Sequence, residues 1–336
     1  MKLLVTGGAG FIGSNFIRYW LNTHPGDSVV NLDALTYAGN VANLDDVVRR
    51  FPKRYTFVHG NIGDYPLVVS LLKEHRPDVI VNFAAESHNS RAVLNPGIFV
   101  ETNVKGTQQL LEAARTVGVA RFHHISTCEV YGDLALDSTE KFTEESPYRP
   151  RTPYNASKAA ADLLVRAYHQ TFNLPVTISN AVNNYGTHQF PEKVIPHFTI
   201  RGLRREPLPL YRNSGFKREW IHVLDHCAAI EAVLLRGRVG ETYNVGSGVE
   251  ADIETIARHV LEELGLDESL KQYVEDRPGH DRRYVLDSTK IKSELNWKPV
   301  IEFDRGIRDA IRWYRDSEHW WRPLLDRHEV VEEAWK

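Results

Sequence analysis

Short apolar runs alternate with longer segments of helical periodicity through the first half of the chain, and this alternation narrows the possible folds more than any other feature. It is typical of repeated β-α-β units, because parallel strands need helical crossovers and are buried on both faces. The predicted strands are residues 3–7, 29–33, 56–62, 78–85, 121–127 and 176–183. The predicted crossover helices lie near residues 12–22, 65–75, 97–117 and 154–172. The pattern predicts an α/β fold built on a doubly wound, Rossmann-type parallel sheet.

The pattern changes beyond about residue 185, where the elements become shorter and Pro and Arg become more frequent. Helices are predicted near residues 193–205, 223–236, 252–264 and 303–316, and strands at 208–211 and 241–247. Neither a repeat nor a Pro/Gly linker separates the halves. We therefore expect residues 186–336 to form a smaller C-terminal α/β lobe packed on residues 1–185, with an approximate boundary that the chain can cross. Two such lobes enclose a cleft at the carboxyl ends of the strands, where ligands of these sheets bind.

Gly7, Gly10 and Gly13 lie in the segment TGGAGFIGS, between the first predicted strand and the first predicted helix. Glycine lets the backbone turn tightly and approach a pyrophosphate, and the N-terminus of the helix offers free amide donors to it. Asp33 ends the second strand, where a carboxylate can bind the ribose of adenosine. No Arg or Lys follows it at once to neutralise a 2′-phosphate. The segment therefore predicts NAD, in preference to NADP.

Tyr154 and Lys158 are four residues apart at the start of a predicted helix, so both side chains lie on one face of it. The ammonium can then lower the pKa of the phenol and hold the nicotinamide ribose. Tyr154 is predicted to be the base that takes a proton from a sugar hydroxyl while a hydride leaves the same carbon. Thr127 ends the fifth strand and can bind that hydroxyl. Glu129 follows, either as a second base or as a solvated charge of the loop.

The composition excludes several classes of function. Lys and Arg number 41 against 44 Asp and Glu, a net charge of −3, so there is no overall basic surface for nucleic acid or an anionic membrane. No run of about 20 apolar residues is present. The two cysteines, Cys128 and Cys227, are too few for a disulfide framework, and neither cysteine nor histidine spacing suggests a metal site. The expected compartment is the cytoplasm, which is reducing.

The motifs together resemble the dTDP-glucose 4,6-dehydratase family of the extended short-chain dehydrogenase/reductase superfamily, over nearly the whole chain. The matching segments are TGGAGFIGS, LTYAGN, FAAESH, STCEVYG, YNASKA, NNYGTHQFPEKVIP, REWIHVLDH, YNVGSG and DRPGHDRRY. The resemblance implies an NAD-dependent lyase acting on a nucleotide sugar. Hydride leaves C4 with Tyr154 as base, Glu129 removes the C5 proton as water leaves C6, and the hydride returns to C6. The product is a 4-keto-6-deoxy sugar.

The resemblance also assigns ligand-binding residues, with NAD on residues 1–185, which carry the catalytic residues, and the nucleotide sugar on the C-terminal lobe. The cofactor residues are Gly7, Gly10, Phe11, Ile12, Gly13, Asp33, Thr36, Asn61, Ile62, Thr102, Tyr154, Lys158 and Asn184. The nucleotide-sugar residues are Ser87, Thr127, Asn183, Lys193, Val194, Pro209, Tyr211, Arg218, Asn244, Arg277 and His280. Its cationic members suit a diphosphate. A homodimer built from the helices near 97–117 and 154–172 is also implied.

Cys128 is the main departure from the family, which has an aspartic acid there as the proposed acid for the departing C6 hydroxyl. A thiol with an ordinary pKa of about 8.5 is mostly protonated at neutral pH and can donate, although it is a weak donor. The predicted catalytic residues are Thr127, Glu129, Tyr154 and Lys158, with Cys128 as a fifth if its thiol acts as the acid. Otherwise Cys128 is a small apolar side chain that fills space. In the second case a water molecule can protonate the departing C6 hydroxyl.

Three alternatives remain open from the sequence. An NDP-hexose 4-epimerase uses the same oxidation at C4 but needs no elimination base, so Glu129 argues against it and Cys128 mildly for it. A variant dehydratase would release the 5,6-unsaturated sugar. A non-catalytic protein that binds NAD or a nucleotide sugar is least favoured, because it would not need Tyr154, Lys158 and Glu129. The nucleotide also stays open between dTDP, which is favoured, and UDP or another.

Overall fold

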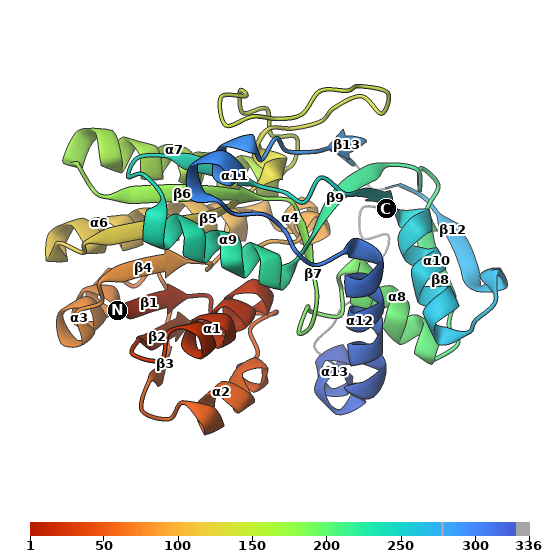
Figure 1. Ribbon diagram of the computed structural model, residues 1–336, viewed down its shortest axis with the longest axis horizontal. Coiled ribbons are helices and arrows are strands. Elements are labelled where there is room, and N and C mark those ends of the chain that lie inside the picture. Colours follow the sequence, from red (N-terminus) through yellow and green to blue (C-terminus); the bar gives the residue numbers. More distant parts are fainter. Residues whose placement is uncertain (277–278, 327–336) are drawn as a thin grey trace.

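The computed structural model describes residues 1–276 and 279–326 and is built around a seven-stranded parallel sheet (Figure 1). The strand order is β10-β6-β5-β4-β1-β2-β3, with every neighbouring pair parallel. The strands are β1 (Lys2–Thr6), β2 (Ser28–Asp33), β3 (Tyr55–His59), β4 (Val79–Asn82), β5 (Arg121–Thr127), β6 (Val176–Ala181) and β10 (Thr242–Val245). The order reverses between β1 and β4, which is where a doubly wound sheet opens a ligand site. The predicted fold class is confirmed.

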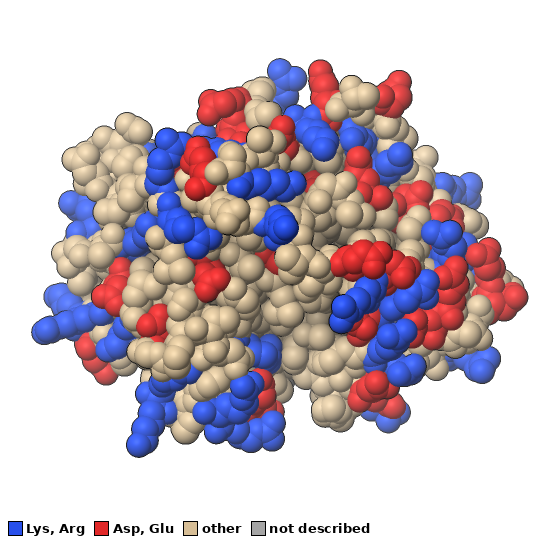
Figure 2. Space-filling model, viewed as in Figure 1, with Lys and Arg blue, Asp and Glu red and all other residues tan. Residues whose placement is uncertain are grey.

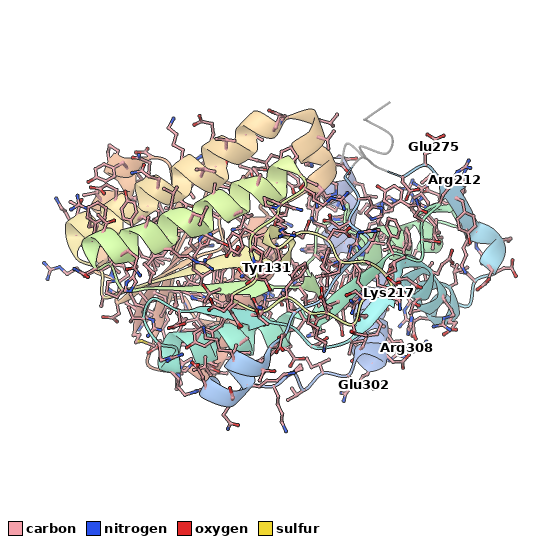
Figure 3. All side chains as sticks on the ribbon, turned by 90° about the horizontal axis from the view of Figure 1, so that it is seen from above. Tyr131, Arg212, Lys217, Glu275, Glu302 and Arg308 are labelled. Atoms are coloured by element: carbon pink, nitrogen blue, oxygen red, sulfur yellow. The ribbon has the colours of Figure 1, made fainter. Side chains whose placement is uncertain are left out.

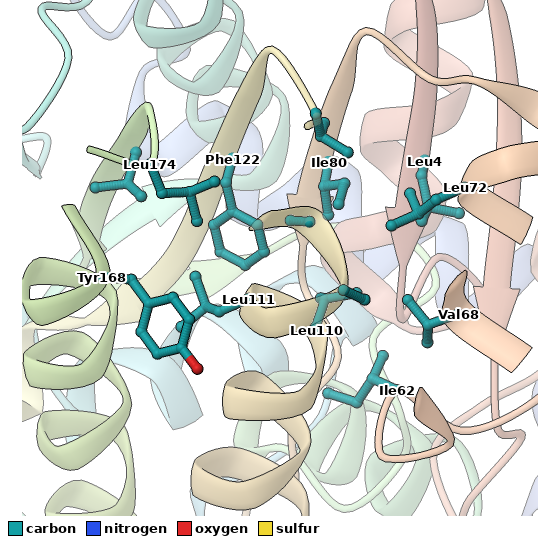
Figure 4. Close-up of a cluster of buried hydrophobic side chains, with 14 of the residues drawn as sticks. Leu4, Ile62, Val68, Leu72, Ile80, Leu110, Leu111, Phe122, Tyr168 and Leu174 are labelled. Atoms are coloured by element: carbon teal, nitrogen blue, oxygen red, sulfur yellow. The ribbon is translucent and has the colours of Figure 1, made fainter. Parts of the chain in front are cut away.

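Helices cover both faces of this sheet, as its apolar strands require. One face packs against α1 (Phe11–Thr23) and α9 (Val223–Arg236), and the other against α3 (Tyr65–His75), α6 (Thr107–Val117) and α7 (Pro153–Phe172). In the second layer, side chains of β1, β4 and β5 meet side chains of these three helices (Figure 4). Each fully buried Leu or Phe of this kind stabilises the fold by roughly 1.5–3 kcal/mol. The layers hold the carboxyl ends of the strands in fixed register.

The predicted helix near residues 97–117 is a composite. It consists of α5 (Pro96–Phe99), the π-helical segment η2 (Val100–Gly106) and α6. Further elements around the sheet are η1 (Val41–Leu44), α2 (Asp45–Arg50), α4 (Asn89–Leu94), η3 (Cys128–Val130) and α11 (Thr289–Leu295). A π-helical turn within an α-helix is frequent near functional sites, and Thr102 of this segment is one of the residues predicted to bind the cofactor.

The C-terminal lobe is made of smaller sheets under helices. Its strands are β7 (Asn183–Tyr185), β8 (Leu208–Tyr211), β9 (Lys217–His222), β11 (Glu250–Asp252), β12 (Lys271–Val274) and β13 (Arg283–Tyr284). Its helices are α8 (Val194–Leu203), α10 (Ile253–Leu264), η4 (Glu268–Leu270), α12 (Phe303–Asp316) and α13 (Glu318–Leu325). β9 pairs with β7, β11 and β13, and β8 pairs with β12. A core of its own lies between α8, α10, α12 and these strands.

The chain crosses between the lobes more than once. β10 lies beyond residue 186 yet forms an edge of the seven-stranded sheet, and α9 packs on that sheet beside α1. The predicted strand 176–183 divides into β6, which stays in the large sheet, and the start of β7, which pairs with β9. The two lobes are therefore interleaved along the chain, and a division at residues 185 and 186 stays a prediction.

Charges of both signs are interleaved where α10 and α12 meet at the surface (Figure 2). Arg308 lies 3.0 Å from Glu262 and Arg312 lies 2.6 Å from Glu263. Exposed pairs of this kind contribute little to the stability of a protein, because water and salt screen their charges. Within residues 1–276 and 279–326, no helix combines the length and the apolar character needed to cross a membrane.

Candidate active site

A cleft of about 820 Å³ opens at the carboxyl ends of the large sheet, and residues of both lobes line it. Every residue predicted to bind the cofactor is part of its wall. Of the residues predicted to bind the nucleotide sugar, the cleft is lined by Ser87, Thr127, Asn183, Lys193, Val194, Pro209, Tyr211, Arg218 and His280. Arg277 lies outside the described residues. The fold thus brings most of both predicted sets into one cavity.

Asn244 is not brought to the cleft. It is fully buried on β10, where its Oδ1 accepts a hydrogen bond from the Tyr131 hydroxyl at 2.9 Å and its Nδ2 donates to the Phe142 carbonyl at 3.0 Å. Its backbone N–H donates to Glu144. Asn244 therefore anchors the loop after β5 to the edge of the sheet, because strand alternation turns it inward. It lies outside the cleft wall, and its contact with substrate stays a prediction.

The glycine loop needs glycine for steric reasons. Gly7 has φ +69°, and a Cβ there would lie 2.6 Å from the Ala84 nitrogen. A Cβ on Gly13 would lie 2.4 Å from the Gly7 carbonyl oxygen. Side chains would therefore push the start of α1 away from β1 and close the space that a pyrophosphate needs. This cradle fits a dinucleotide.

Asp33 closes the adenosine end of the cradle. Its two carboxylate oxygens accept backbone hydrogen bonds from Ala9 and Leu35, both at 2.8 Å. Burial raises the pKa of Asp33, while these two hydrogen bonds act in the opposite direction. The loop that follows carries Thr36 into the cleft wall and has no adjacent cation. These features fit the ribose of NAD and disfavour a 2′-phosphate.

The helix α7 positions Tyr154 and Lys158. It starts at Pro153, and the Thr152 hydroxyl caps it by accepting the backbone N–H of Asn155 at 3.2 Å. Lys158 donates to the Ile125 carbonyl at 2.7 Å, and its Nζ lies 3.3 Å from the Nε2 of His124. Burial lowers the pKa of Lys158 to about 8. Both side chains reach the cleft from one face of the helix, as their spacing predicts.

The expected lowering of the Tyr154 pKa is not seen. Burial raises the pKa of Tyr154, and the nearby Glu129 carboxylate raises it further. Lys158 is instead held by the end of β5 and by the buried Asp162, whose pKa burial raises to about 6. The Asp162 carboxylate accepts hydrogen bonds from Ser126 at 2.7 Å and Tyr148 at 3.0 Å. Lys158 thus has a charged neighbour behind it that the sequence motif does not show.

Glu129 and Thr127 line the cleft, whereas Cys128 between them does not. The Cys128 side chain is buried with Val182, Ile221 and Tyr284. Burial raises the pKa of the thiol well above its ordinary value, and the Glu129 carboxylate adds to that effect. Cys128 is therefore a neutral, enclosed side chain, and this placement favours the interpretation as a small apolar filler over a catalytic acid.

The cationic residues predicted to bind a diphosphate enter the cleft from the C-terminal lobe. Lys193 donates to the Ser87 carbonyl at 3.2 Å. The Arg218 guanidinium lies 4.7 Å from the Tyr284 ring centre and donates to the Asp281 carbonyl at 2.5 Å. Arg218 is thus fixed in place before any ligand arrives, which suits a preformed anion site.

Two further residues of the cleft wall, Tyr37 and Glu192, were not predicted individually, and neither was Arg91, which lies behind them. Arg91 on α4 donates to Glu192 at 3.0 Å and lies 3.9 Å above the Tyr37 ring. Burial would raise the pKa of Glu192, but His88, Lys193 and Arg91 outweigh it and hold that pKa low. Tyr37 and Glu192 lie in two of the matching segments, LTYAGN and NNYGTHQFPEKVIP, so the resemblance held a signal for them.

The fold and the cleft define a class of protein: an extended short-chain dehydrogenase/reductase, with a dinucleotide cradle beside a Tyr-x-x-x-Lys helix and a second lobe for substrate. Within the described part of the chain, no cluster of His, Cys, Asp or Glu could hold a metal ion. The family model described as GDP-mannose 4,6 dehydratase matches residues 4–310. The chain belongs to this family of nucleotide-sugar dehydratases.

Individual relatives place it more narrowly. The dTDP-glucose 4,6-dehydratase of Xanthomonas campestris pv. campestris (strain B100) is 49% identical, over 96% of this chain and 95% of that protein. The crystal structure of DesIV, a dTDP-glucose 4,6-dehydratase from Streptomyces venezuelae with NAD and TYD bound, matches with a TM-score of 0.93 and 48% identity, over 96% of this chain and all of that one. The UDP-glucose 4-epimerase of Thermotoga maritima, solved with UDP-glucose, reaches 0.87 at 27% identity, over 94% and 99% of the two chains. The dehydratases are thus much closer in sequence than this epimerase.

Proposed function

We propose that this chain is an NAD-dependent lyase that converts dTDP-glucose, or a closely related nucleotide hexose, into the 4-keto-6-deoxy sugar. The observation that carries the proposal is the position of Glu129, which lines the same cleft as Tyr154, Lys158 and the glycine cradle. Besides NAD as the hydride acceptor, an oxidation at C4 needs only the tyrosine and the lysine. A carboxylate beside them is what an elimination from the neighbouring carbons requires.

The residues of the cleft divide the reaction into steps. Tyr154 acts as the base in its ionised form: the phenolate takes the proton of the C4 hydroxyl and becomes a neutral phenol, and the Lys158 ammonium stabilises the phenolate before that transfer. The resulting ketone makes the C5 proton acidic, so Glu129 can remove it only after C4 is oxidised. The C6 hydroxyl then leaves as water. Bound NAD supplies the acceptor for the C4 hydride and returns that hydride to C6.

Protonation of the departing C6 oxygen is assigned to water. The Cys128 thiol is enclosed by apolar side chains and does not line the cleft. Thr127, one residue earlier, does line it and is placed to bind a sugar hydroxyl. Lys193, Arg218, Tyr211 and the residues around them bind the nucleotide diphosphate in this proposal, with dTDP favoured because the close relatives named above are dTDP-glucose enzymes.

The direct test is to incubate the purified protein and NAD with dTDP-glucose and, separately, with UDP-glucose, and to identify the products by NMR. A 4-keto-6-deoxy product is expected, with dTDP-glucose converted faster. A galactose configuration would identify an epimerase, and a vinylic C6 signal would identify the 5,6-ene-forming variant. Glu129→Gln is the matched control, since it should still oxidise C4 but should not exchange the C5 hydrogen with solvent.

We also propose that the protein forms a homodimer through α7 and the stretch α5–η2–α6. These helices run side by side on one face of the molecule (Figure 3). Large apolar side chains on them are exposed, with 54% for Val100 and 57% for Leu163. Such exposure on neighbouring helices supports the proposed interface. Light scattering of the wild type and of Leu163→Glu tests it, with a dimer expected for the first and a monomer for the second.

The proposed compartment is the cytoplasm. Both cysteines are buried and unpaired, as is usual for proteins of a reducing compartment. Fractionation of cells that express a tagged chain tests this assignment, with recovery outside the cytoplasmic fraction as the contrary result.

A further inference from the structure

A second layer of hydrogen bonds lies behind Glu129 and links it to the helix that carries Tyr154. The backbone N–H of Asn155 donates to the Thr152 hydroxyl at 3.2 Å. The Thr152 hydroxyl donates to Oδ1 of Asn89 at 2.7 Å, and Nδ2 of Asn89 donates to Oε2 of Glu129 at 2.8 Å. The series joins the N-terminus of α7, the start of α4 and the end of β5. No motif that predicted the site includes Asn89.

The direction of each hydrogen bond follows from its neighbour. Because the Thr152 oxygen accepts a backbone N–H, its own proton is available to donate. Oδ1 of Asn89 accepts that proton, so the amide can present only its NH2 group to Glu129. An NH2 group cannot accept, and the carboxylate must therefore be the acceptor. A hydrogen bond to a charged group also stabilises the charged form.

We infer that Asn89 is a positioning residue for the elimination step: it fixes the Glu129 carboxylate through Oε2 and leaves Oε1 to take the C5 proton of the substrate. The inference rests on the proposed function. Within the described residues, the Glu129 carboxylate forms no ion pair, and Asn89 gives it its one side-chain hydrogen bond. The neutral amide of Asn89 therefore orients the carboxylate, as a Lys or Arg side chain does in many sites, but it does not neutralise the charge that makes Glu129 a base.

The same series of hydrogen bonds holds the two bases, Tyr154 and Glu129, in a fixed position relative to each other. Thr152 caps α7, and Tyr154 lies two residues further along that helix. Glu129 is tied to this cap through Asn89, so oxidation at C4 and deprotonation at C5 are carried out by groups held in fixed relation. A displacement of a base by about 1 Å can slow a reaction by about a hundredfold. Fixing Glu129 is therefore as important as its charge.

The other groups that face Glu129 do not replace the amide of Asn89. They are Tyr154 from α7, Cys128 on its own turn, and Asp281 and Tyr284 from the segment around β13. Asp281 is the one carboxylic acid among them, and Arg151 lies 3.5 Å from it. None of these donates a hydrogen bond to the Glu129 carboxylate. Loss of the Asn89 donor should thus leave the carboxylate without a fixed orientation toward the substrate.

The test compares Asn89→Leu, which removes the donor, with Asn89→Asp, which keeps the shape but replaces NH2 by an acceptor. Asn95→Leu, an exposed asparagine just beyond the other end of α4, is the control. Two steps are measured separately: exchange of the C5 hydrogen with solvent deuterium, and single-turnover formation of reduced nicotinamide.

We expect Asn89→Leu to slow C5 exchange about tenfold or more, since a hydrogen bond to a charged group is worth about that much. Reduced nicotinamide should still form at about the wild-type rate. Asn89→Asp should slow C5 exchange at least as much, because its carboxylate repels that of Glu129 instead of donating to it. Wild-type C5 exchange in both variants, or an equal loss of both steps, overturns the inference. A wild type that makes no 4-keto-6-deoxy product refutes the proposed function instead.

Discussion

The closest backbone approach in the cofactor cradle makes Gly13→Ala the most informative single change. The added methyl group would lie 2.4 Å from the Gly7 carbonyl oxygen and 2.8 Å from the Gly8 Cα. Both neighbours are backbone atoms that cannot rotate away. Either α1 must move outward along its first turn, or the turn after β1 must open. Each movement withdraws the free amides of the helix from the pyrophosphate position.

The magnitude follows from two opposing effects. Forcing a methyl group into a close-packed site is unfavourable by roughly 1–3 kcal/mol. Replacing glycine by alanine inside a helix stabilises the helix by about 1 kcal/mol. The free energy of unfolding should therefore fall by about 2 kcal/mol at most. NAD affinity receives no such compensation, and it should fall by roughly ten- to a hundredfold, since each 1.4 kcal/mol is about tenfold.

The assay is titration of NAD by calorimetry, with chemical denaturation of the same samples. Two further glycines provide a graded comparison. A Cβ on Gly10 would lie 3.3 Å from the Gly7 carbonyl oxygen, so Gly10→Ala should weaken NAD binding less than Gly13→Ala. A Cβ on Gly26 would have no atom within 4 Å, so Gly26→Ala should leave the affinity unchanged. Wild-type affinity in Gly13→Ala would refute the steric argument for the cradle.

Three other changes test the remaining assignments. Tyr154→Phe should slow C4 oxidation by roughly a hundredfold or more, seen as loss of reduced nicotinamide in a single turnover, and a normal rate would remove Tyr154 as the base. Cys128→Ala should lower the free energy of unfolding by about 1 kcal/mol but leave water loss near the wild-type rate, and a selective loss of dehydration would restore the thiol as an acid. Burial raises the pKa of Asp162 from 3.8 to about 6, so the folded chain binds a proton in this window that the unfolded chain does not. Its carboxylate therefore destabilises the fold above about pH 6. The free energy of unfolding of the wild type and of Asp162→Asn should be measured by denaturation between about pH 6 and pH 3.8. As the pH falls through this range, the wild type should become more stable relative to the variant by up to about 3 kcal/mol. A difference that stays constant with pH would contradict the raised pKa.

Strands and helices with strong local patterns could be predicted from the sequence. Strands β1, β2 and β5 and the helices α1, α3 and α7 fall within one or two residues of their predicted bounds. The short strands β7, β11 and β13 were missed, because two or three residues leave no periodicity to detect. β9 was missed since its sequence, KREWIH, carries charges that its neighbours pair or cover. Tertiary packing alone makes these segments extended.

The large sheet contains one strand whose place could not be predicted. Residues 241–247 read as a strand, and β10 indeed covers Thr242–Val245. Its pairing with β6 depends on α9 crossing the face of the sheet after a long excursion through the C-terminal lobe. No local sequence pattern predicts that β10 pairs with β6, because neighbouring parallel strands need not be close in the sequence.

The candidate site shows the same division between local and distant information. The cradle and the Tyr154–Lys158 pair are local motifs whose geometry follows from a turn or from one helical period. Asn89 has no comparable pattern, since its role depends on the fold bringing Glu129 and Thr152 to it. The Arg91–Glu192 pair likewise joins residues about a hundred positions apart.

Cys128 shows how one step of backbone geometry changes a chemical interpretation. In the sequence it stands between Thr127 and Glu129, so all three were assigned to catalysis. Thr127 is extended, with φ −139° and ψ 149°. Side chains in extended backbone alternate between two faces, so the residue after Thr127 points away from the cleft. Cys128 therefore enters the apolar cluster with Tyr284, and the 3-10 turn η3 that begins there brings Glu129 back to the cleft wall. The proton for the departing C6 oxygen must consequently come from a group inside the cleft, and for this reason the proposed reaction assigns that proton to water.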